Sequence, residues 1–210
     1  MAAPLPPLIR LALLLASPAY LAFAREPVLG GPCDGCEIVF VGLPAQPPTE
    51  AQIAPPGEPG APMLISGRVT TPDGRAAAGV IIYAYQTDRA GIYPRSDDLP
   101  REARRHGRLR AWAITDAAGQ YRFRTIRPGS YPNLRIAAHV HLHVIEPGKG
   151  TYYIDDLHFA DDPLLTPADR QRLPNRGGAG GALPEQDPQG AWHARRDIVL
   201  GLNIPDYPNP

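Results

Sequence analysis

The stretch Ala137-Ala138-His139-Val140-His141-Leu142-His143-Val144-Ile145 alternates imidazoles with aliphatic side chains. Successive side chains of a β-strand point to opposite faces, so the three histidines would share one face and the apolar residues the other. Side chains two residues apart begin about 6.6 Å apart along a strand. Two imidazoles that lean together can then reach one metal ion at about 2.1 Å. The stretch predicts a strand with a metal-binding face, with histidines on a solvent-facing strand as the alternative.

Seven other segments have the apolar, β-branched or aromatic composition of strands, namely residues 37–41, 63–70, 80–86, 110–115, 121–126, 152–159 and 197–202. Turn residues rich in Pro, Asp and Gly predict hairpins over 63–87 and 110–126. A single short helix is expected, with Thr166 as its N-cap and Pro167 at its first position. The pattern therefore predicts an all-β fold with little helix, an antiparallel sandwich or barrel with long loops.

The amino-acid composition is consistent with a protein that has many turns and a single hydrophobic core. The 210 residues include 27 Pro and 21 Gly, about twice the usual share, while 43% of the chain is hydrophobic. Lys and Arg together number 21, as do Asp and Glu, so the formal charge is zero. A neutral chain of this length predicts one globular domain and argues against a nucleic-acid partner.

The N-terminus is predicted to be an export signal over residues 1–24. Arg10 precedes an apolar run, and Ala22-Phe23-Ala24 has the small residues of a signal-peptidase site, which places cleavage after Ala24. The apolar stretch 11–24 is shorter than the roughly 20 residues of a membrane-spanning helix. We expect an exported protein, periplasmic or secreted, without a membrane span after processing; an uncleaved anchor is the alternative.

The rest of the chain is predicted to comprise an N-terminal arm with a CxxC motif (25–62), the β-sandwich (63–204) and a C-terminal tail (205–210). Residues 44–62, with their many prolines, suggest an extended arm, and 174–190 suggest a surface loop. Neither is expected to enter the core. Cys33 and Cys36 most simply form a local disulfide, because tetrahedral zinc needs two more ligands and the chain has no other cysteine.

A longer motif leads up to the histidines. The run Thr115-Asp116-Ala117-Ala118-Gly119-Gln120-Tyr121-Arg122-Phe123-Arg124-Thr125-Ile126-Arg127-Pro128-Gly129-Ser130-Tyr131-Pro132 precedes them, and Gly91-Ile92-Tyr93 stands after an earlier strand segment. This arrangement resembles the core of the intradiol ring-cleavage dioxygenases, the family of protocatechuate 3,4-dioxygenase and catechol 1,2-dioxygenase. The resemblance covers roughly residues 62–163 and implies a β-sandwich. With its signal peptide and Gly-Gly-Pro-Cys opening, the chain looks like an exported branch.

The resemblance implies a non-haem Fe(III) centre with four protein ligands, Tyr93, Tyr131, His139 and His141. Two phenolates are hard, strongly donating anions that favour Fe(III), whereas imidazoles alone would serve zinc or copper equally well. The implied reaction cleaves a small aromatic diol with O2 between its hydroxyl-bearing carbons and yields a muconate-type diacid. Tyr131 would leave the metal when the diol binds and take up a substrate proton. No organic cofactor or external reductant is implied.

Two positions depart from the family pattern. The family's catalytic arginine stands three residues before the first histidine, where this chain has Ile136; Arg135 lies one residue earlier and is assigned the arginine's role. Asp156 stands where the family has a glutamine. Two other functions are considered: a zinc or copper protein using His139, His141 and His143, and a non-catalytic β-sandwich binding module. The residues leave open which catechol is used and whether the protein forms a homo-oligomer.

Overall fold

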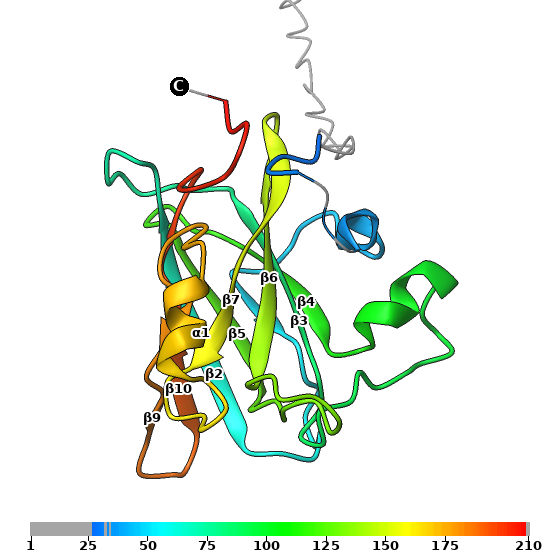
Figure 1. Cartoon of the computed structure of the whole chain (residues 1–210). Coiled ribbons are helices and arrows are strands. Elements are labelled where there is room, and N and C mark those ends of the chain that lie inside the picture. The colour runs from blue at the N-terminus through cyan, green and yellow to red at the C-terminus, as the bar shows by residue number, and fades with distance from the viewer. Residues whose placement is uncertain (1–26, 32, 34, 209–210) are drawn as a thin grey trace, which may run out of the picture.

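The structure, a computed structural model, describes residues 27–31, 33 and 35–208 and consists of two packed β-sheets (Figure 1). The predicted signal peptide, residues 1–24, lies outside the described residues. No helix in the described part of the chain has the length and apolarity needed to cross a bilayer. Cys33 and Cys36 are joined in the disulfide that their spacing predicted.

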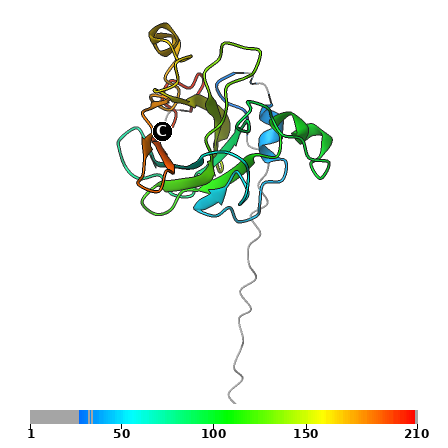
Figure 2. The ribbon, with the colours of Figure 1, turned by 90° about the horizontal axis from the view of Figure 1, so that it is seen from below.

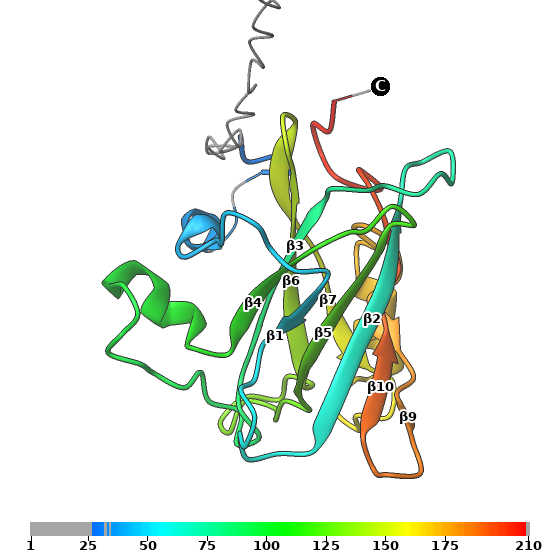
Figure 3. The same ribbon diagram turned by 180° about the vertical axis from the view of Figure 1, so that it is seen from behind.

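The first sheet has the order β1-β5-β2-β10-β9, and β11 also pairs with β2 (Figure 3). Its central pair, β2 and β5, is antiparallel, whereas β1, β10 and β11 join it in parallel. The bounds of its strands are β1 Glu50–Gln52, β2 Pro62–Thr70, β5 Gln120–Ile126, β9 Glu185–Gln186, β10 Trp192–Arg195 and β11 Ile198–Val199.

The second sheet has the order β4-β3-β6-β7-β8 and is antiparallel except where β8 joins β7. Figure 2 shows the two sheets facing each other across the core. The bounds of its strands are β3 Ile81–Gln86, β4 Arg110–Ile114, β6 His139–Glu146, β7 Gly150–Phe159 and β8 Gly181–Ala182. The predicted all-β sandwich is therefore confirmed, with parallel pairing added by short strands.

The second sheet is buried on both faces. Val140, Leu142 and Val144 of β6 point into the core between the sheets. On the opposite face a smaller apolar cluster, which includes Tyr83 and Tyr85 of β3, is covered by the 3-10 helix η1, Cys36–Phe40. Alternation along a strand therefore places the histidines of β6 on this outer face, beside the tyrosines of β3.

Both predicted hairpins are wrong. β2 and β3 belong to different sheets, as do β4 and β5, so the turns at 71–74 and 116–119 carry the chain from one sheet to the other. The partner of β2 is β5, and β3 pairs with β4 and β6. Turn residues indicate where a chain reverses, but they do not specify which strand it then pairs with.

Three further expectations need correction. Residues 37–41 form most of η1 and not a strand, since a short apolar run does not distinguish the two. The supposed arm contributes Ala51, Ile53 and Ala54 to the core, and the 174–190 segment contributes Ala182. Within 197–202 only Ile198–Val199 is a strand.

The predicted short helix is confirmed as α1, Pro167–Arg172, with a capping box. The Thr166 side chain accepts from the Asp169 amide, and Asp169 accepts from the Thr166 amide in return. Two 3-10 helices complete the structure described, η1 and η2, the latter spanning Arg101–His106. In the predicted tail, the Tyr207 hydroxyl donates to the buried Glu146 carboxylate at 2.9 Å.

Candidate metal centre

Two histidines of the site come from the start of β6, on the outer face of the second sheet. His139 and His141 are both partly exposed, and their Nε2 atoms lie 3.2 Å apart. Tyr85, directly opposite His141 on β3, stacks on the imidazole with ring centroids 4.4 Å apart. The strand and this stacking set the direction in which His141 points.

The two tyrosines come from loops that are tied to each other. The Gly129 amide donates to the Asp88 carbonyl, and the Thr87 hydroxyl donates to the Gly129 carbonyl, both at 2.8 Å. Gly91 has a positive φ of 77°, and a Cβ there would lie 1.9 Å from the Ser130 carbonyl oxygen. Only glycine permits this approach. This close approach brings the loop that precedes Tyr93 into contact with the loop that precedes Tyr131.

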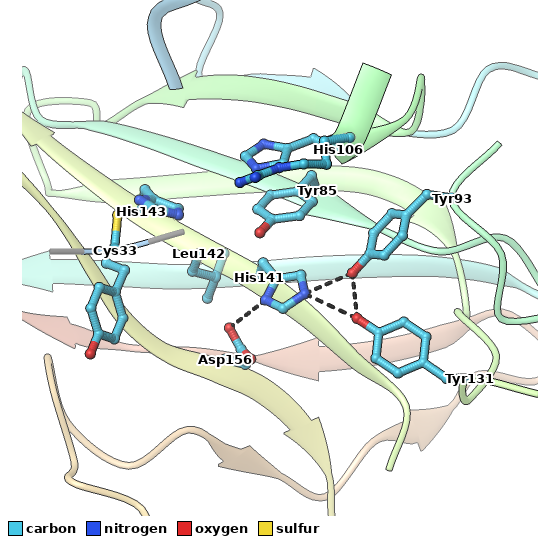
Figure 4. Close-up of a pocket in the computed structure, with 11 residues that line it drawn as sticks. Cys33, Tyr85, Tyr93, His106, Tyr131, His141, Leu142, His143 and Asp156 are labelled. Carbon is cyan, nitrogen blue, oxygen red and sulfur yellow. Dashed lines mark hydrogen bonds and ion pairs between the residues drawn. The ribbon is translucent and has the colours of Figure 1, made fainter. Parts of the chain in front are cut away.

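Tyr93, Tyr131 and His141 point toward one another (Figure 4), and His139 lies beside them. The Tyr93 hydroxyl lies 2.6 Å from the Tyr131 hydroxyl and 2.7 Å from His141 Nε2. The Tyr131 hydroxyl lies 3.3 Å from His139 Nε2 and 3.4 Å from His141 Nε2. These four residues, which we call the donor cluster, are the four that the sequence assigned to the metal.

The tautomers of both histidines follow from their other partners. His139 Nδ1 lies 2.7 Å from the Ala137 carbonyl oxygen, and His141 Nδ1 lies 3.0 Å from Asp156 Oδ1. A carbonyl and a carboxylate only accept, so each Nδ1 carries a hydrogen, and each ring directs its Nε2 into the cluster. Two lone pairs 3.2 Å apart cannot bond to each other. A cation between them would remove their repulsion.

Both phenols resist ionisation in the protein alone. Burial raises the pKa of Tyr93, and its neighbour Tyr131 raises it further. Burial also raises the pKa of Tyr131, although the hydrogen bond from Tyr93 opposes the shift. Burial lowers the pKa of His139, and His141 lowers it further. The cluster therefore disfavours phenolate at both tyrosines and imidazolium at His139, and a bound cation would reverse the preference of the phenols.

The geometry fits a single metal ion. Two atoms that each lie about 2.1 Å from one ion are about 3.0 to 3.4 Å apart. The two Nε2 atoms and the Tyr131 hydroxyl lie 3.2 to 3.4 Å from one another, whereas the Tyr93 hydroxyl is at hydrogen-bond distance from Tyr131 and His141. Two oxygen and two nitrogen donors without a thiolate suit a transition metal of hard to borderline character. The donor cluster can therefore hold a non-haem ion through these four atoms.

Asp156, on β7, contacts the donor cluster through His141. Its carboxylate accepts from His141 Nδ1, the arrangement that orients metal-bound histidines and increases their basicity. Burial opposes ionisation of Asp156, yet the interactions with His141 leave its pKa below the ordinary value. The sequence located Asp156 near the site, but only the structure shows the hydrogen bond to His141.

We expect Asp156→Asn to lower the affinity for iron about 10- to 100-fold, because the amide is a weaker acceptor for His141 Nδ1. Competitive titration with a chelator measures this. Asp161→Asn is the control, since Asp161 forms an ion pair with Arg127 away from the cluster. Equal affinities for Asp156→Asn and the unmodified protein would show that Asp156 does not support the ligand.

Arg135 does not join the cluster. It is exposed, between Tyr131 and the start of β6, and is not among the residues that line the cavity described below. Ile136, at the position of the family's arginine, is also exposed, at 42%. The role assigned to Arg135 in catalysis stays a prediction. His143 is buried further along β6, on the same face.

His106, to which the sequence assigned no partner, is buried beside the site. Its ring stacks on Tyr85 at 3.7 Å between centroids, so Tyr85 lies between His106 and His141 (Figure 4). The Tyr83 hydroxyl lies 2.9 Å from His106 Nδ1. Nothing in the sequence pattern indicates this contact, because His106 belongs to the loop that contains η2 and not to a strand.

Burial lowers the pKa of His106 to about 3. The unfolded chain therefore binds more protons than the folded one below about pH 6.5, and the stability present above that pH is lost as the pH falls. From pH 7 to pH 5 this group alone should reduce the free energy of unfolding by about 2 kcal/mol. Urea unfolding at several pH values measures the slope. His106→Gln should flatten it and the exposed His193→Gln should not; equal slopes for both variants would contradict the assignment.

A cavity of about 560 Å³ adjoins the donor cluster. Tyr93, Tyr131 and His141 lie at one end, and Cys33, His143 and Tyr153 line it as well. Arg105 of η2 adds a positive charge to its lining. The volume exceeds that of a single aromatic ring, so the cavity can admit a small aromatic molecule beside the cluster.

Fold and site together define a β-sandwich protein that presents two tyrosines and two histidines to one ion. The family model described as Dioxygenase matches residues 40–173. The chain belongs to the intradiol ring-cleavage dioxygenase family.

Relatives agree with this assignment. The protocatechuate 3,4-dioxygenase beta chain of Burkholderia cepacia is 32% identical over 118 residues, which are 52% of this chain and 49% of that protein. The chain thus matches about half the length of this relative. The structure of catechol 1,2-dioxygenase from Acinetobacter sp. ADP1 has a TM-score of 0.57 at 21% identity, over 85% of this chain and 62% of that one.

A third comparison covers nearly a whole domain. The dioxygenase domain of a dioxygenase carbohydrate-binding protein fusion from Streptomyces sp. SirexAA-E has a TM-score of 0.52 at 23% identity. The match covers 74% of this chain and 90% of that one. At these identities the structural comparisons establish a shared fold.

Proposed function

We propose that this protein is a non-haem Fe(III) dioxygenase that cleaves a catechol-type aromatic between its two hydroxyl-bearing carbons with O2, giving a muconate-type diacid. The observation that carries the proposal is the donor cluster, in which the Tyr131 hydroxyl and His139 and His141 Nε2 lie 3.2 to 3.4 Å from one another and the Tyr93 hydroxyl lies within 2.7 Å of Tyr131 and His141. Membership of the intradiol family supports the reaction class.

Tyr93, Tyr131, His139 and His141 would hold the iron. When bound, ferric iron supplies a Lewis acid that favours the phenolate and catecholate forms over the phenols. Two phenolates offset two of its three charges, and they favour the ferric state, which neutral imidazoles alone would not select.

The two tyrosines are not equivalent. The Tyr93 hydroxyl lies 2.7 Å from His141 Nε2, whereas the Tyr131 hydroxyl is 3.3 Å or more from either histidine. Tyr131 is thus farther from His141 than Tyr93 is. It lies in the loop that follows β5 and lines the cavity. We assign to Tyr131 the role of accepting a proton from the substrate hydroxyl, and to Tyr93 and the histidines the role of holding the ion.

The cavity supports a small aromatic diol as the substrate. Tyr85 shields one side of His141 by stacking, and the cavity extends from the donor cluster toward Cys33 and His143. A planar ring entering here would place its hydroxyls at the donor cluster and any ring substituent toward the far end. The far end has room for a substituent, because the cavity of about 560 Å³ is several times the size of one ring.

Visible spectroscopy and product analysis test the function together. Iron-loaded protein should be coloured by tyrosinate-to-Fe(III) charge transfer, and anaerobic addition of catechol should change the colour. Admission of O2 should then yield the ring-opened diacid. Colourless protein after iron loading, or the aldehyde product of extradiol cleavage, would contradict the proposal. A zinc protein would stay colourless throughout.

We also propose that the protein is exported, with cleavage after Ala24. The proposal rests on the sequence of residues 1–24, and the Cys33–Cys36 disulfide supports it because such bonds persist in oxidising compartments. Mass spectrometry of the protein recovered from an expressing host should show a chain that begins at Arg25. A mature chain that retains residues 1–24 would contradict cleavage.

A further inference from the structure

The far end of the cavity contains a second group of metal-ligating side chains. Sulfur atoms of Cys33 and Cys36 and a ring nitrogen of His143 all lie within 4.8 Å of one another. Cys33 and His143 both line the cavity, at the end opposite Tyr131 (Figure 4). Sequence spacing alone argued against metal binding by the CxxC motif because it showed no third ligand, and the fold supplies one.

His143 has an unused polar atom at this place. The residue is only 4% exposed, and its Nδ1 has no hydrogen-bond partner among the described residues. A buried nitrogen without a partner is unfavourable, and a ligand from outside the polypeptide would relieve that cost. β6 holds the ring in place between Tyr83 of β3 and Tyr153 of β7.

The CxxC segment is held in place by contacts other than the disulfide. In η1, Ile38 is 1% exposed and Val39 is fully buried, and Trp112 Nε1 donates to the Val39 carbonyl at 2.7 Å. Gly35, between the cysteines, has a φ of 86°, and a Cβ there would lie 2.4 Å from His106 Nε2. Gly35 and η1 are therefore packed against the body of the protein by contacts that do not depend on the disulfide.

We propose that reduction of the Cys33–Cys36 disulfide creates a second metal site, in which both thiolates and His143 bind a borderline-soft divalent cation such as Zn²⁺. Two molecules of a small thiol donate two electrons and become a disulfide, and Cys33 and Cys36 become thiols. Binding of the cation then releases two protons and forms two metal–sulfur bonds and one metal–nitrogen bond. The two thiolates neutralise the ion, and the fourth position faces the cavity.

This site is separate from the donor cluster. His143 lies two residues beyond His141 on the same face of β6, about 6.6 Å further along the strand. Its ligands include sulfur, whereas the donor cluster offers only oxygen and nitrogen. A cation bound there would occupy the end of the cavity that a ring substituent would otherwise enter. In an oxidising compartment the disulfide keeps this end open, and exposure to a thiol reductant together with the cation would fill it.

Cadmium binding by the metal-stripped full chain tests the proposal. After treatment with a small thiol and its anaerobic removal, the protein should bind one Cd²⁺ with thiolate-to-cadmium absorption in the ultraviolet and release two protons. The oxidised protein should show no such band. Tyrosine and histidine ligands do not produce the band, so its appearance is independent of the proposed dioxygenase function.

The variants distinguish a three-ligand site from a pair of thiols. His143→Gln should keep two titratable thiols and weaken Cd²⁺ binding at least about tenfold, and Cys36→Ser should abolish the band. His193→Gln, on the exposed part of β10, should bind as the unmodified protein does. Equal affinity in His143→Gln, no band in the reduced protein, or loss of the near-ultraviolet circular dichroism on reduction would each overturn the proposal.

Discussion

Replacement of Tyr93 by Phe should weaken the visible absorption of the iron-loaded protein, leaving only the contribution of Tyr131, and lower turnover of catechol by at least about a hundredfold. The expected loss exceeds the 10- to 100-fold cost of removing a residue that only supports a metal ligand. Tyr93 makes the two shortest contacts within the donor cluster, 2.6 Å to Tyr131 and 2.7 Å to His141. Phe keeps the ring and its packing but removes the oxygen, so the fold should be unaffected.

The measurements are iron content, the intensity of the visible band and steady-state oxygen uptake. Tyr153→Phe is the matched control, because Tyr153 lines the same cavity outside the donor cluster. Its iron content and band should equal those of the unmodified protein. If Tyr93→Phe retained a full-strength band and turnover, Tyr93 would not be a ligand, and the proposed centre would be wrong.

Arg196→Met should destabilise the protein by about 3 kcal/mol or more, because several buried carbonyl oxygens would each lose a donor at a cost of about 1 to 3 kcal/mol. Arg196 is 1% exposed and donates to the backbone carbonyls of Gly177, Asp197, Asp155 and Arg176. Methionine fills much of the volume but donates no hydrogen bond, so buried carbonyl oxygens would lose their partners. Those carbonyls belong to β7, to the 174–180 segment and to the residue next to Arg196.

Chemical denaturation of the metal-free protein measures the free energy of unfolding. The adjacent Arg195→Met is the control, because Arg195 is exposed and forms a surface ion pair with Asp197, a contact worth at most about 1 kcal/mol. A loss below about 1 kcal/mol for Arg196→Met would mean that water replaces the guanidinium at these carbonyls.

The strands and the donor residues were predictable from the sequence because each depends on a local pattern or a motif. Alternation along 137–145 reveals which side chains of β6 share a face, whatever strands lie beside it. The capping box at Thr166 is likewise complete within four residues. The family resemblance named all four members of the donor cluster before any distance between them was known.

Strand pairing was not predictable in the same way. The two hairpins failed because a tight turn in a sandwich can join strands of one sheet or connect the two sheets, and the residues of the turn are the same in both cases. Residues 44–62 and 174–190 looked like peripheral segments, since Pro and Gly obscure the few buried side chains that pin them to the core. The strands that pair in parallel, β1, β8, β10 and β11, each span four residues or fewer, too short for a periodic signal.

Tertiary structure alone decided what surrounds the donor cluster. The bond from His141 to Asp156, the stack of His106 on Tyr85, the carbonyls around Arg196 and the meeting of His143 with the CxxC motif all join residues distant in the chain. A local sequence pattern indicates the conformation of its own segment and the face on which each side chain lies. Which groups meet across that face depends on how the sheets pack and the loops close, and the energy of those contacts exists only in the assembled fold.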